Sequence, residues 1–203
     1  MDQSEARDAA TSPVIMIEGE LVALGPLRRD LIPLYQRWID DLSTLRTLDL
    51  PPLPITLEQE QRWYEGAGAT DDHTPFTIYE RATWAPIGTT DLRGINHRRG
   101  TAEFGIMIGE PSARGKGYGT ETARLMLDYA FTVLGLRNVT LRTAEFNFAG
   151  RRAYEKAGYR EFGRRRQCRP MGGHLWDDVY MDCLASDFSS PVLSRILIAD
   201  EPR

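Results

Sequence analysis

The residues with the clearest chemical role form the glycine-rich run RGKGYGTE, which occupies residues 114–121. Apolar residues recur at helical spacing directly after it, so the run opens an amphipathic helix. The first N–H groups of a helix have no partners within the helix, and the helix dipole adds positive potential there. Glycine also lets the backbone approach an anion closely. The run therefore predicts a phosphate-binding loop at a helix N-terminus.

The spacing of this run decides which phosphate ligand it suits. The chain contains neither GxxxxGKS/T, typical of nucleoside triphosphate sites, nor GxGxxG followed about twenty residues later by an acidic residue, typical of dinucleotide sites. It does contain the pattern R-x-x-G-x-G, formed by Arg114, Gly117 and Gly119. Three fixed positions are a weak signal alone, so the elements around them must be considered.

The elements that must position the loop are two strands and a second helix. Residues 102–111 read as a strand that leads into the loop, and residues 138–143 read as another strand. Residues 147–159 then form a short helix, with Asn147 as its N-cap and Gly158 as its stop. The loop is thereby predicted to lie between a strand and a helix that are both anchored in a core.

This order of elements resembles the core of the GNAT superfamily of acetyl-CoA-dependent acyltransferases. The similarity is greatest to the branch with ribosomal-protein N-terminal and spermidine acetyltransferases, in which runs similar to GKGYGTE, LDYAF and AYEKAGY occur together. It extends to residues 172–181 and so covers most of the chain. The resemblance implies an α/β (α+β) GNAT fold, which is a twisted, mostly antiparallel mixed sheet with flanking helices and a splayed central strand pair that binds acetyl-CoA.

The resemblance also implies how acetyl-CoA is held, as a cosubstrate and without a metal ion. The loop would bind the pyrophosphate, and the strand before it would pair with the pantetheine amides and supply an N–H to the developing oxyanion. For Asn147 the N-cap role alone explains the residue type, and contact with pantetheine is a second reading. The expected cofactor-binding residues are Ile106, Met107, Ile108, Arg114, Gly115, Lys116, Gly117, Tyr118, Gly119, Thr120, Asn147 and Arg152.

Tyr154 is the candidate general acid. Acetyl transfer needs a neutral amine, a donor to the thioester oxygen and a proton for the departing thiolate. Tyr154 occupies the position where the family carries a tyrosine, and a phenol with a pKa near 10 can protonate a thiolate. The alternative is a core tyrosine whose ring packs and whose hydroxyl only forms a hydrogen bond.

Glu103 is the candidate general base, because related enzymes carry a carboxylate on this strand that holds a water near the amine. Strand alternation places Glu103 on the same face as Gly105 and Met107. A solvated glutamate at a strand edge is the competing interpretation. Asp91 and Glu145 are rival bases, and Asp177 and Asp178 are expected to fix a turn or orient the substrate.

Composition agrees with one compact domain in a chain of 203 residues, of which 41% are hydrophobic. A net charge of −4 argues against nucleic acid as the main partner. Two cysteines, with no secretory segment or membrane-spanning run, favour a cytoplasmic protein with free thiols and no membrane partner. The three histidines lack metal-ligand spacing, so no metal is expected.

The chain divides into a loose tail over residues 1–13, the GNAT domain over 14–184 and a C-terminal tail over 185–203. Residues 15–24 read as the first strand, and residues 31–39 as a helix. The last tail contains Val192, Leu193, Ile196, Leu197 and Ile198, which is too apolar for simple disorder. It is predicted to pack on its own domain or on a second subunit, and a homodimer is the preferred alternative.

The acceptor cleft is predicted to lie beside residues 49–54, because three prolines there exclude regular helix. Thr56 and Gln59 form a capping box for the next helix, which carries Trp63 on its apolar side. The acidic residues that flank the cleft favour a cationic acceptor, although surface solubility explains them equally well. They are Asp40, Asp41, Asp49, Glu58 and Glu60.

These observations predict direct acetyl transfer to an amine of a small molecule, such as a polyamine, an amino sugar or an antibiotic. A protein N-terminus, as in ribosomal-protein acetyltransferases, is the alternative acceptor. A different class also stands open, because fold does not fix function: the chain could be a non-catalytic acyl-CoA-binding regulatory module. The intact loop and Tyr154 argue against that class.

Overall fold

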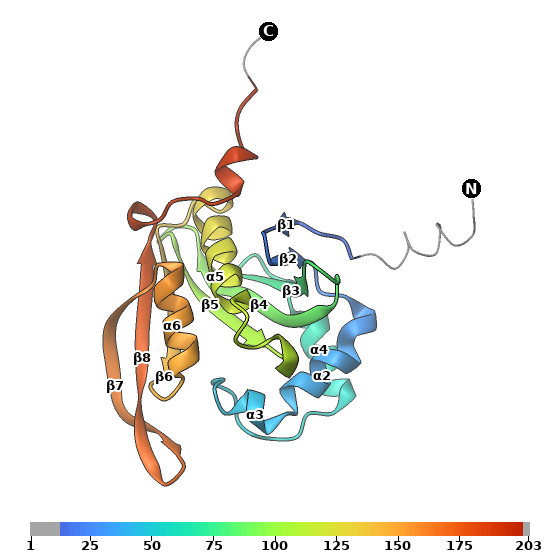
Figure 1. Cartoon of the computed structure of the whole chain (residues 1–203), viewed down its shortest axis with the longest axis vertical. Helices are drawn as coiled ribbons and strands as arrows, with labels where there is room; N and C mark the ends of the chain where they lie inside the picture. Colours follow the sequence, from blue (N-terminus) through green and yellow to red (C-terminus); the bar gives the residue numbers. More distant parts are fainter. Residues whose placement is uncertain (1–12, 201–203) are drawn as a thin grey trace, which may run out of the picture.

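A mixed sheet of eight strands organises the computed structural model, which describes residues 13–200 (Figure 1). The strand order is β1-β2-β3-β4-β5-β6-β8-β7. The strands are β1 (Ile17–Glu18), β2 (Val22–Gly25), β3 (His73–Glu80), β4 (Pro86–Asn96), β5 (Thr101–Ile108), β6 (Asn138–Ala144), β7 (Arg160–Met171) and β8 (His174–Leu184). The helices are α2 (Ile32–Ile39), α3 (Leu42–Leu45), α4 (Leu57–Gly66), α5 (Tyr118–Asp128) and α6 (Phe148–Ala157), with short 3₁₀ segments at Arg29–Leu31, Pro111–Ala113, Ala185–Asp187 and Leu193–Arg195.

The pairing of β5 with β6 confirms the predicted splay at the centre of the sheet. These two strands are parallel, whereas the other neighbouring strands are antiparallel. They pair only over Thr101 to Glu103 and Asn138 to Thr140, after which β5 runs on to Ile108 without this partner. A backbone edge of β5 is therefore open towards β6, and Figure 1 shows the two strands diverging below α5 and α6.

The helices cover both faces of the sheet. Ile78 on β3 belongs to the apolar core that contains Met126 of α5, whereas the adjacent Thr77 hydrogen-bonds the hydroxyl of Tyr35 on α2 at 2.6 Å. Because successive strand residues point to opposite faces, α2 and α5 lie on opposite faces. Beyond α5, a π-helical turn (Tyr129–Val133) leads to a stop at Gly135, whose φ is +64°.

The prediction of one strand over residues 15–24 was wrong, because the chain turns back between β1 and β2. The carboxylate of Glu121 accepts hydrogen bonds from the N–H groups of Glu20, Leu21 and Val22 at 2.7–2.8 Å. A Cβ at Gly19 would lie 2.9 Å from that carboxylate, so a side chain does not fit there. This partner is about a hundred residues away in sequence, which local alternation cannot reveal.

The predicted C-terminal tail docks in part on its own domain, which was one of the two alternatives. The buried carboxylate of Asp128 accepts hydrogen bonds from the N–H groups of Val192 and Leu193 at 3.0 and 2.9 Å. Leu193 is buried, whereas Ile196 and Ile198 are exposed. The homodimer stays a prediction, and the predicted N-terminal tail lies, except for its last residue, outside the described residues.

Candidate active site

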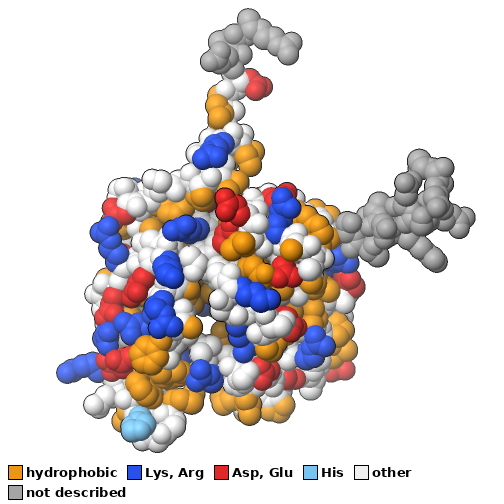
Figure 2. Space-filling model, viewed as in Figure 1, with side chains coloured by type: hydrophobic (Ala, Val, Ile, Leu, Met, Phe, Trp, Pro, Cys, Tyr) orange, Lys and Arg blue, Asp and Glu red, His pale blue; other side chains and the backbone are white. Residues whose placement is uncertain are grey.

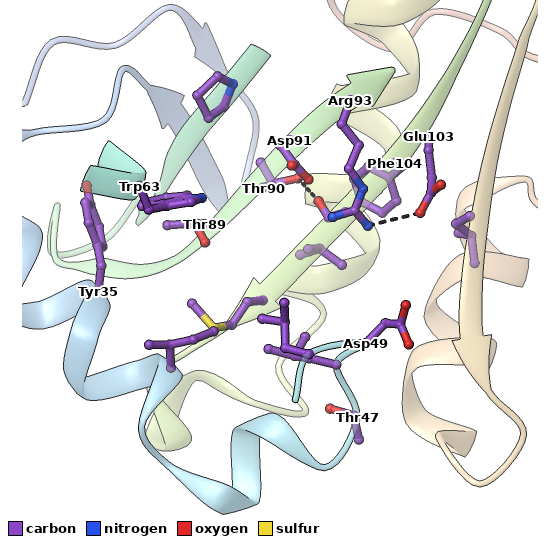
Figure 3. A pocket seen from close by; sticks show the side chains of 18 of the residues that line it. Tyr35, Thr47, Asp49, Trp63, Thr89, Thr90, Asp91, Arg93, Glu103 and Phe104 are labelled. Carbon is purple, nitrogen blue, oxygen red and sulfur yellow. Dashed lines mark hydrogen bonds and ion pairs between the residues drawn. The ribbon is translucent and has the colours of Figure 1, made fainter. Parts of the chain in front are cut away.

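A cavity of about 610 Å³ opens beside the splayed strands (Figure 3). Its wall combines residues of α2, α4 and α6 with residues of β3 to β6 and of the segment between α3 and α4. Figure 3 shows Tyr35 and Trp63 at one end of the cavity and Glu103 with Phe104 at the other. Asp49 lies on the segment that was predicted to border the cleft, and it lines the wall. The capping box of Thr56 and Gln59 that starts α4 is also confirmed.

The glycine-rich loop presents a run of free backbone donors. Gly115 and Gly117 have φ values of +78° and +91°, a left-handed conformation that glycine adopts without strain. Gly117 is the N-cap of α5. Within residues 13–200, the N–H groups of residues 115–119 have no acceptor. Such consecutive donors at a helix N-terminus form an anion-binding concavity, which is the chemistry expected of this loop.

Two side chains of this helix start hold the loop on the sheet, and the sequence did not reveal either role. Glu121 binds the turn between β1 and β2, as described above. The hydroxyl of Tyr118 donates a hydrogen bond to Glu80 at the end of β3. Because Val22 and Glu80 are paired on β2 and β3, Tyr118 and Glu121 anchor the first helical turn to the same region of the sheet.

The side chain of Arg114 lies elsewhere than its assignment to the cofactor implied. Its guanidinium donates to the carbonyl of Ile108 at 3.1 Å and to Oγ1 of Thr44 at 2.6 Å. It also lies 3.8 Å from the carboxylate of Asp41, at the start of α3. Arg114 thus ties the end of β5 to α3, and its backbone N–H donates to the carbonyl of Pro111 at 3.2 Å, so its predicted contact with the cofactor stays a prediction. Lys116 and Arg152 are exposed as well.

Tyr154 lines the cavity from α6 with its ring packed and its hydroxyl free. The ring makes edge contacts with Phe104 and Tyr159, with ring centroids 6.2 Å apart in each pair. Within the described residues, the hydroxyl has no hydrogen-bond partner. Burial raises the pKa of Tyr154 to about 12, so the phenol is protonated at neutral pH and can donate. The ring thus packs against the core while Tyr154 lines the cavity, and its role as the general acid stays a prediction.

The three candidate bases differ in position. Glu103 lines the cavity but forms an ion pair with Arg93 at 3.1 Å. Asp91 also lines it and contacts Nε2 of His73 at 2.9 Å. Glu145 lies outside the cavity wall and pairs with Arg164 at 2.8 Å. Each carboxylate already has a basic partner, so each would have to share its lone pairs to take a proton from an amine.

Asn147 acts as the N-cap of α6, as predicted. Its Oδ1 accepts the N–H of Gly150 at 3.1 Å, and its Nδ2 donates to Oγ1 of Thr143 at 3.1 Å. Both ends of the amide are therefore used within the protein. The predicted contact with pantetheine would have to share these atoms, and it stays a prediction.

A network of ion pairs that sequence reasoning missed closes one side of the cavity. Asp49 pairs with Arg142 of β6 and with Arg169 of β7, the latter at 3.0 Å. Asp178, which is buried, holds Arg169 at 2.8 Å and Arg142 at 3.5 Å. Asp178 thus orients two arginines, while Asp177 accepts the N–H of Gln167 at 2.9 Å where the register of β7 shifts. No sequence signal links position 49 to position 169.

Glu60 is one of the acidic residues that were predicted to flank the cleft, with surface solubility as the alternative. It is only 6% exposed and lines the cavity, so the cleft position is the one observed. Burial, together with the nearby Asp40, raises the pKa of Glu60 to about 7. A signal was present in the sequence, because Glu60 and Trp63 are three residues apart and share a helix face.

Two general properties complete the description. Among residues 13–200, no three His, Cys, Asp or Glu side chains are grouped as a metal site requires, and no helix is long and apolar enough to cross a bilayer. Figure 2 shows basic and acidic side chains interspersed on the face viewed there, without a large area of a single sign.

Comparison with known families and proteins agrees with this geometry. Residues 22–160 match the family described as "Acetyltransferase (GNAT) domain". The alpha/beta-tubulin-N-acetyltransferase 9 of Drosophila melanogaster is 34% identical over 125 residues, which are 56% of this chain and 62% of that protein. The spermidine N(1)-acetyltransferase of Vibrio cholerae is 38% identical over 86 residues, 42% of this chain and 49% of that protein. The chain thus spans less than two thirds of either relative.

A solved structure extends the agreement to the whole fold. The crystal structure of spermidine N-acetyltransferase from Vibrio cholerae, in complex with CoA and spermine, superposes with a TM-score of 0.76 at 24% sequence identity. The match covers 83% of this chain and 98% of that one. At this identity the likeness bears on the fold alone.

Proposed function

The chain belongs to the GNAT acetyltransferase family, and we propose that it transfers an acetyl group from acetyl-CoA directly to an amine of a small molecule. The observation that carries the proposal is the open edge of β5, which lies between the free backbone donors of residues 115–119 and the cavity lined by Tyr154. A phosphate-bearing thioester and an amine can therefore approach one strand from two directions.

The residues divide the reaction between them. The N–H groups of residues 115–119 would bind the pyrophosphate, and the open edge of β5 would pair with pantetheine. An N–H within residues 106–108 would stabilise the oxyanion as the amine nitrogen attacks the thioester carbon. When the C–S bond breaks, Tyr154 would give its proton to the CoA thiolate, and the acetylated nitrogen would pass its extra proton to a base, for which Glu103 is the candidate, or to water. No covalent enzyme intermediate is required.

A second acceptor class has support from one observation. Relatives of this chain are named alpha/beta-tubulin-N-acetyltransferase 9, so a protein N-terminus is the alternative acceptor. The cavity volume falls within the range of sites for small ligands, which favours a small amine. From composition we also expect a cytoplasmic location. Residues 196–198 are apolar and exposed, so we further expect a homodimer.

The test is an assay of free CoA released from acetyl-CoA with a panel of amines and N-terminal peptides. We expect release with at least one small amine, and acetyl-CoA should raise the melting temperature of the protein. Release only with peptides would favour the alternative acceptor. Neither release nor a melting shift with millimolar acetyl-CoA would contradict the proposal.

A further inference from the structure

Glu60 places a buried carboxylate without a partner on the wall of the acceptor cavity. It lies in the middle of α4, lines the cavity and is 6% exposed. Its side chain forms neither a hydrogen bond nor an ion pair with any residue that the structure describes. The charge known to act on it is that of Asp40, which is also negative. A buried carboxylate is costly unless it is paired or neutralised, so this position calls for a cation.

The other acidic residues on the wall differ from Glu60 in this respect. Asp49, Asp91 and Glu103 each have a basic partner at 2.9 to 3.1 Å. The arginines compensate the charges of Asp49 and Glu103, and the carboxylate of Asp91 shares a hydrogen bond with His73. Among these acidic residues of the cavity wall, Glu60 is therefore the one whose carboxylate has no protein partner for a positively charged ligand to compete with.

Three neutral polar side chains of α2 and α4 already have hydrogen-bond partners. The hydroxyl of Tyr35 interacts with Thr77, and the side chain of Gln59 accepts the N–H of Thr56 in the capping box. The side chain of Gln36 donates to the carbonyl of Ile55. Rotation of these groups towards Glu60 would break existing hydrogen bonds, so a ligand in the cavity can pair with Glu60 at a smaller cost than these side chains can.

Aromatic rings complete the surroundings of this carboxylate. Trp63 lies about one helical turn beyond Glu60, 40% exposed and on the cavity wall. Its ring makes an edge contact with Tyr35, with centroids 6.2 Å apart. Figure 3 shows both rings at the end of the cavity that is remote from Glu103. The face of an indole attracts an ammonium group, and a nearby carboxylate adds to this attraction.

We propose that Glu60 and Trp63 form a subsite that binds an alkylammonium group of the acceptor. The inference rests on the proposed function, since it assigns the substrate class of the same cavity. The bound group has two possible sources, the amine that reacts or a second amine of the same molecule. If it is the reacting amine, its N–H proton passes to the carboxylate, which becomes a carboxylic acid, and the neutral nitrogen then attacks the thioester.

The experiment compares wild type with Glu60→Gln, using 1,4-diaminobutane, butylamine and 4-amino-1-butanol as probes. Glu58→Gln is the matched control, because it removes the same charge from an exposed position of the same helix. Binding is measured without acetyl-CoA, as the melting shift caused by each probe and by calorimetric titration. Steady-state kinetics with acetyl-CoA follow for the probes that react.

We expect at least one probe to bind wild type and Glu58→Gln, and Glu60→Gln to bind it about 10- to 100-fold more weakly, the range for one lost charged hydrogen bond. Loss for the diamine alone assigns the second amine, and loss for every probe assigns the reacting amine. Equal binding by wild type and Glu60→Gln overturns the inference, as does the absence of binding to wild type. Failure of the proposed function is distinct, because it would appear as no CoA release while Glu60-dependent binding persists.

A stability measurement guards against a purely structural role. Glu60→Gln removes an unpaired buried charge, so at pH 8 its melting temperature should equal or exceed that of wild type. A variant that melts lower and still binds the probes as wild type does would show that Glu60 supports packing only, and the inference would fall.

Discussion

The loop that presents free backbone donors and the cavity that faces it meet at β5, but they are assembled differently. The loop is one continuous stretch, residues 114–121, and its donors belong to the backbone. The cavity wall combines side chains from α2, α4, β3 to β6 and α6, far apart in sequence. Backbone donors depend on the local conformation alone, whereas the wall depends on which side chains the fold brings together. The donors of the loop are therefore set within one stretch of chain, while the chemistry of the wall is set by side chains from several elements.

The two regions are also fastened by different interactions. Three backbone N–H groups fix the loop through one carboxylate, that of Glu121. The segment beside the cavity is held by Asp49 through ion pairs, and Asp49 is half exposed. Exposed ion pairs are weak and are screened by salt, whereas charged hydrogen bonds to backbone are stronger. We therefore expect a rigid loop and a more adaptable cavity.

The largest effect is expected where the two regions meet. Tyr154→Phe keeps the packed ring and deletes the hydroxyl, so turnover should fall by roughly 10² to 10⁴-fold while CoA affinity and melting temperature persist. Tyr159→Phe is the matched control, because this neighbouring tyrosine is buried and does not line the cavity. Measured turnover near the wild-type value for Tyr154→Phe would leave a packing role only.

The next largest effect is a pH dependence of the free energy of unfolding, which is due to Glu60 on the cavity wall. The pKa of Glu60 is raised from 4.5 to about 7 in the folded protein, so the folded state binds more protons between these values. Wild type should thus lose stability relative to Glu60→Gln as pH rises from about 4.5 to about 7, by roughly 3 kcal/mol in all. Denaturant unfolding of both proteins at several pH values measures this. A constant difference over that window would mean that Glu60 titrates normally.

Loss of a loop glycine should weaken CoA binding and leave the cavity intact. A Cβ at Gly119 would meet nothing within 4 Å in the protein, so Gly119→Val tests the space that the ligand needs. We expect roughly 10- to 100-fold weaker CoA affinity, the equivalent of one lost charged hydrogen bond. Gly163→Val on β7, which also meets nothing within 4 Å, should bind CoA normally. Equal affinities of the two variants would place the phosphates elsewhere.

Removing the anchor of the loop should cost stability. Glu121→Gln replaces one acceptor oxygen by an amide donor that faces backbone N–H groups, so the free energy of unfolding should fall by about 1 to 3 kcal/mol. Chemical denaturation measures the change, with Glu155→Gln on the exposed side of α6 as control. A change smaller than that of the control would show that packing, and not this carboxylate, holds the turn between β1 and β2.

The smallest effect is expected at the fastening of the cavity. Asp49→Asn weakens a half-exposed ion-pair cluster, which is worth about 0 to 1 kcal/mol, so the KM for the acceptor should rise no more than about fivefold. The rise should diminish at high salt, because added ions already screen the wild-type pairs. A large, salt-independent loss of turnover would instead place Asp49 in contact with the substrate.

The sequence predicted those parts whose cause is local. Glycines at residues 115, 117 and 119 followed by helical periodicity are sufficient for a free helix N-terminus, and the structure has one there. Asn147 and the Thr56 capping box follow from hydrogen bonds between residues three positions apart. The splay of β5 and β6, in contrast, was predicted from the resemblance to the GNAT family and not from local spacing.

Only the tertiary structure decided what depends on residues that are distant in the chain. Arg114 donates a hydrogen bond to Thr44, Glu121 accepts one from Leu21 in the turn between β1 and β2, and Arg169 forms an ion pair with Asp49. The partners in each pair are far apart in sequence, so no local pattern predicts these interactions. The burial of Glu60 is a further example. A glutamate on an amphipathic helix is expected to be exposed, and only the tertiary structure, in which α2 contacts α4, shows that Glu60 is buried. Conformation near a residue follows from its neighbours in sequence, whereas the burial and pairing of a charge follow from its neighbours in space.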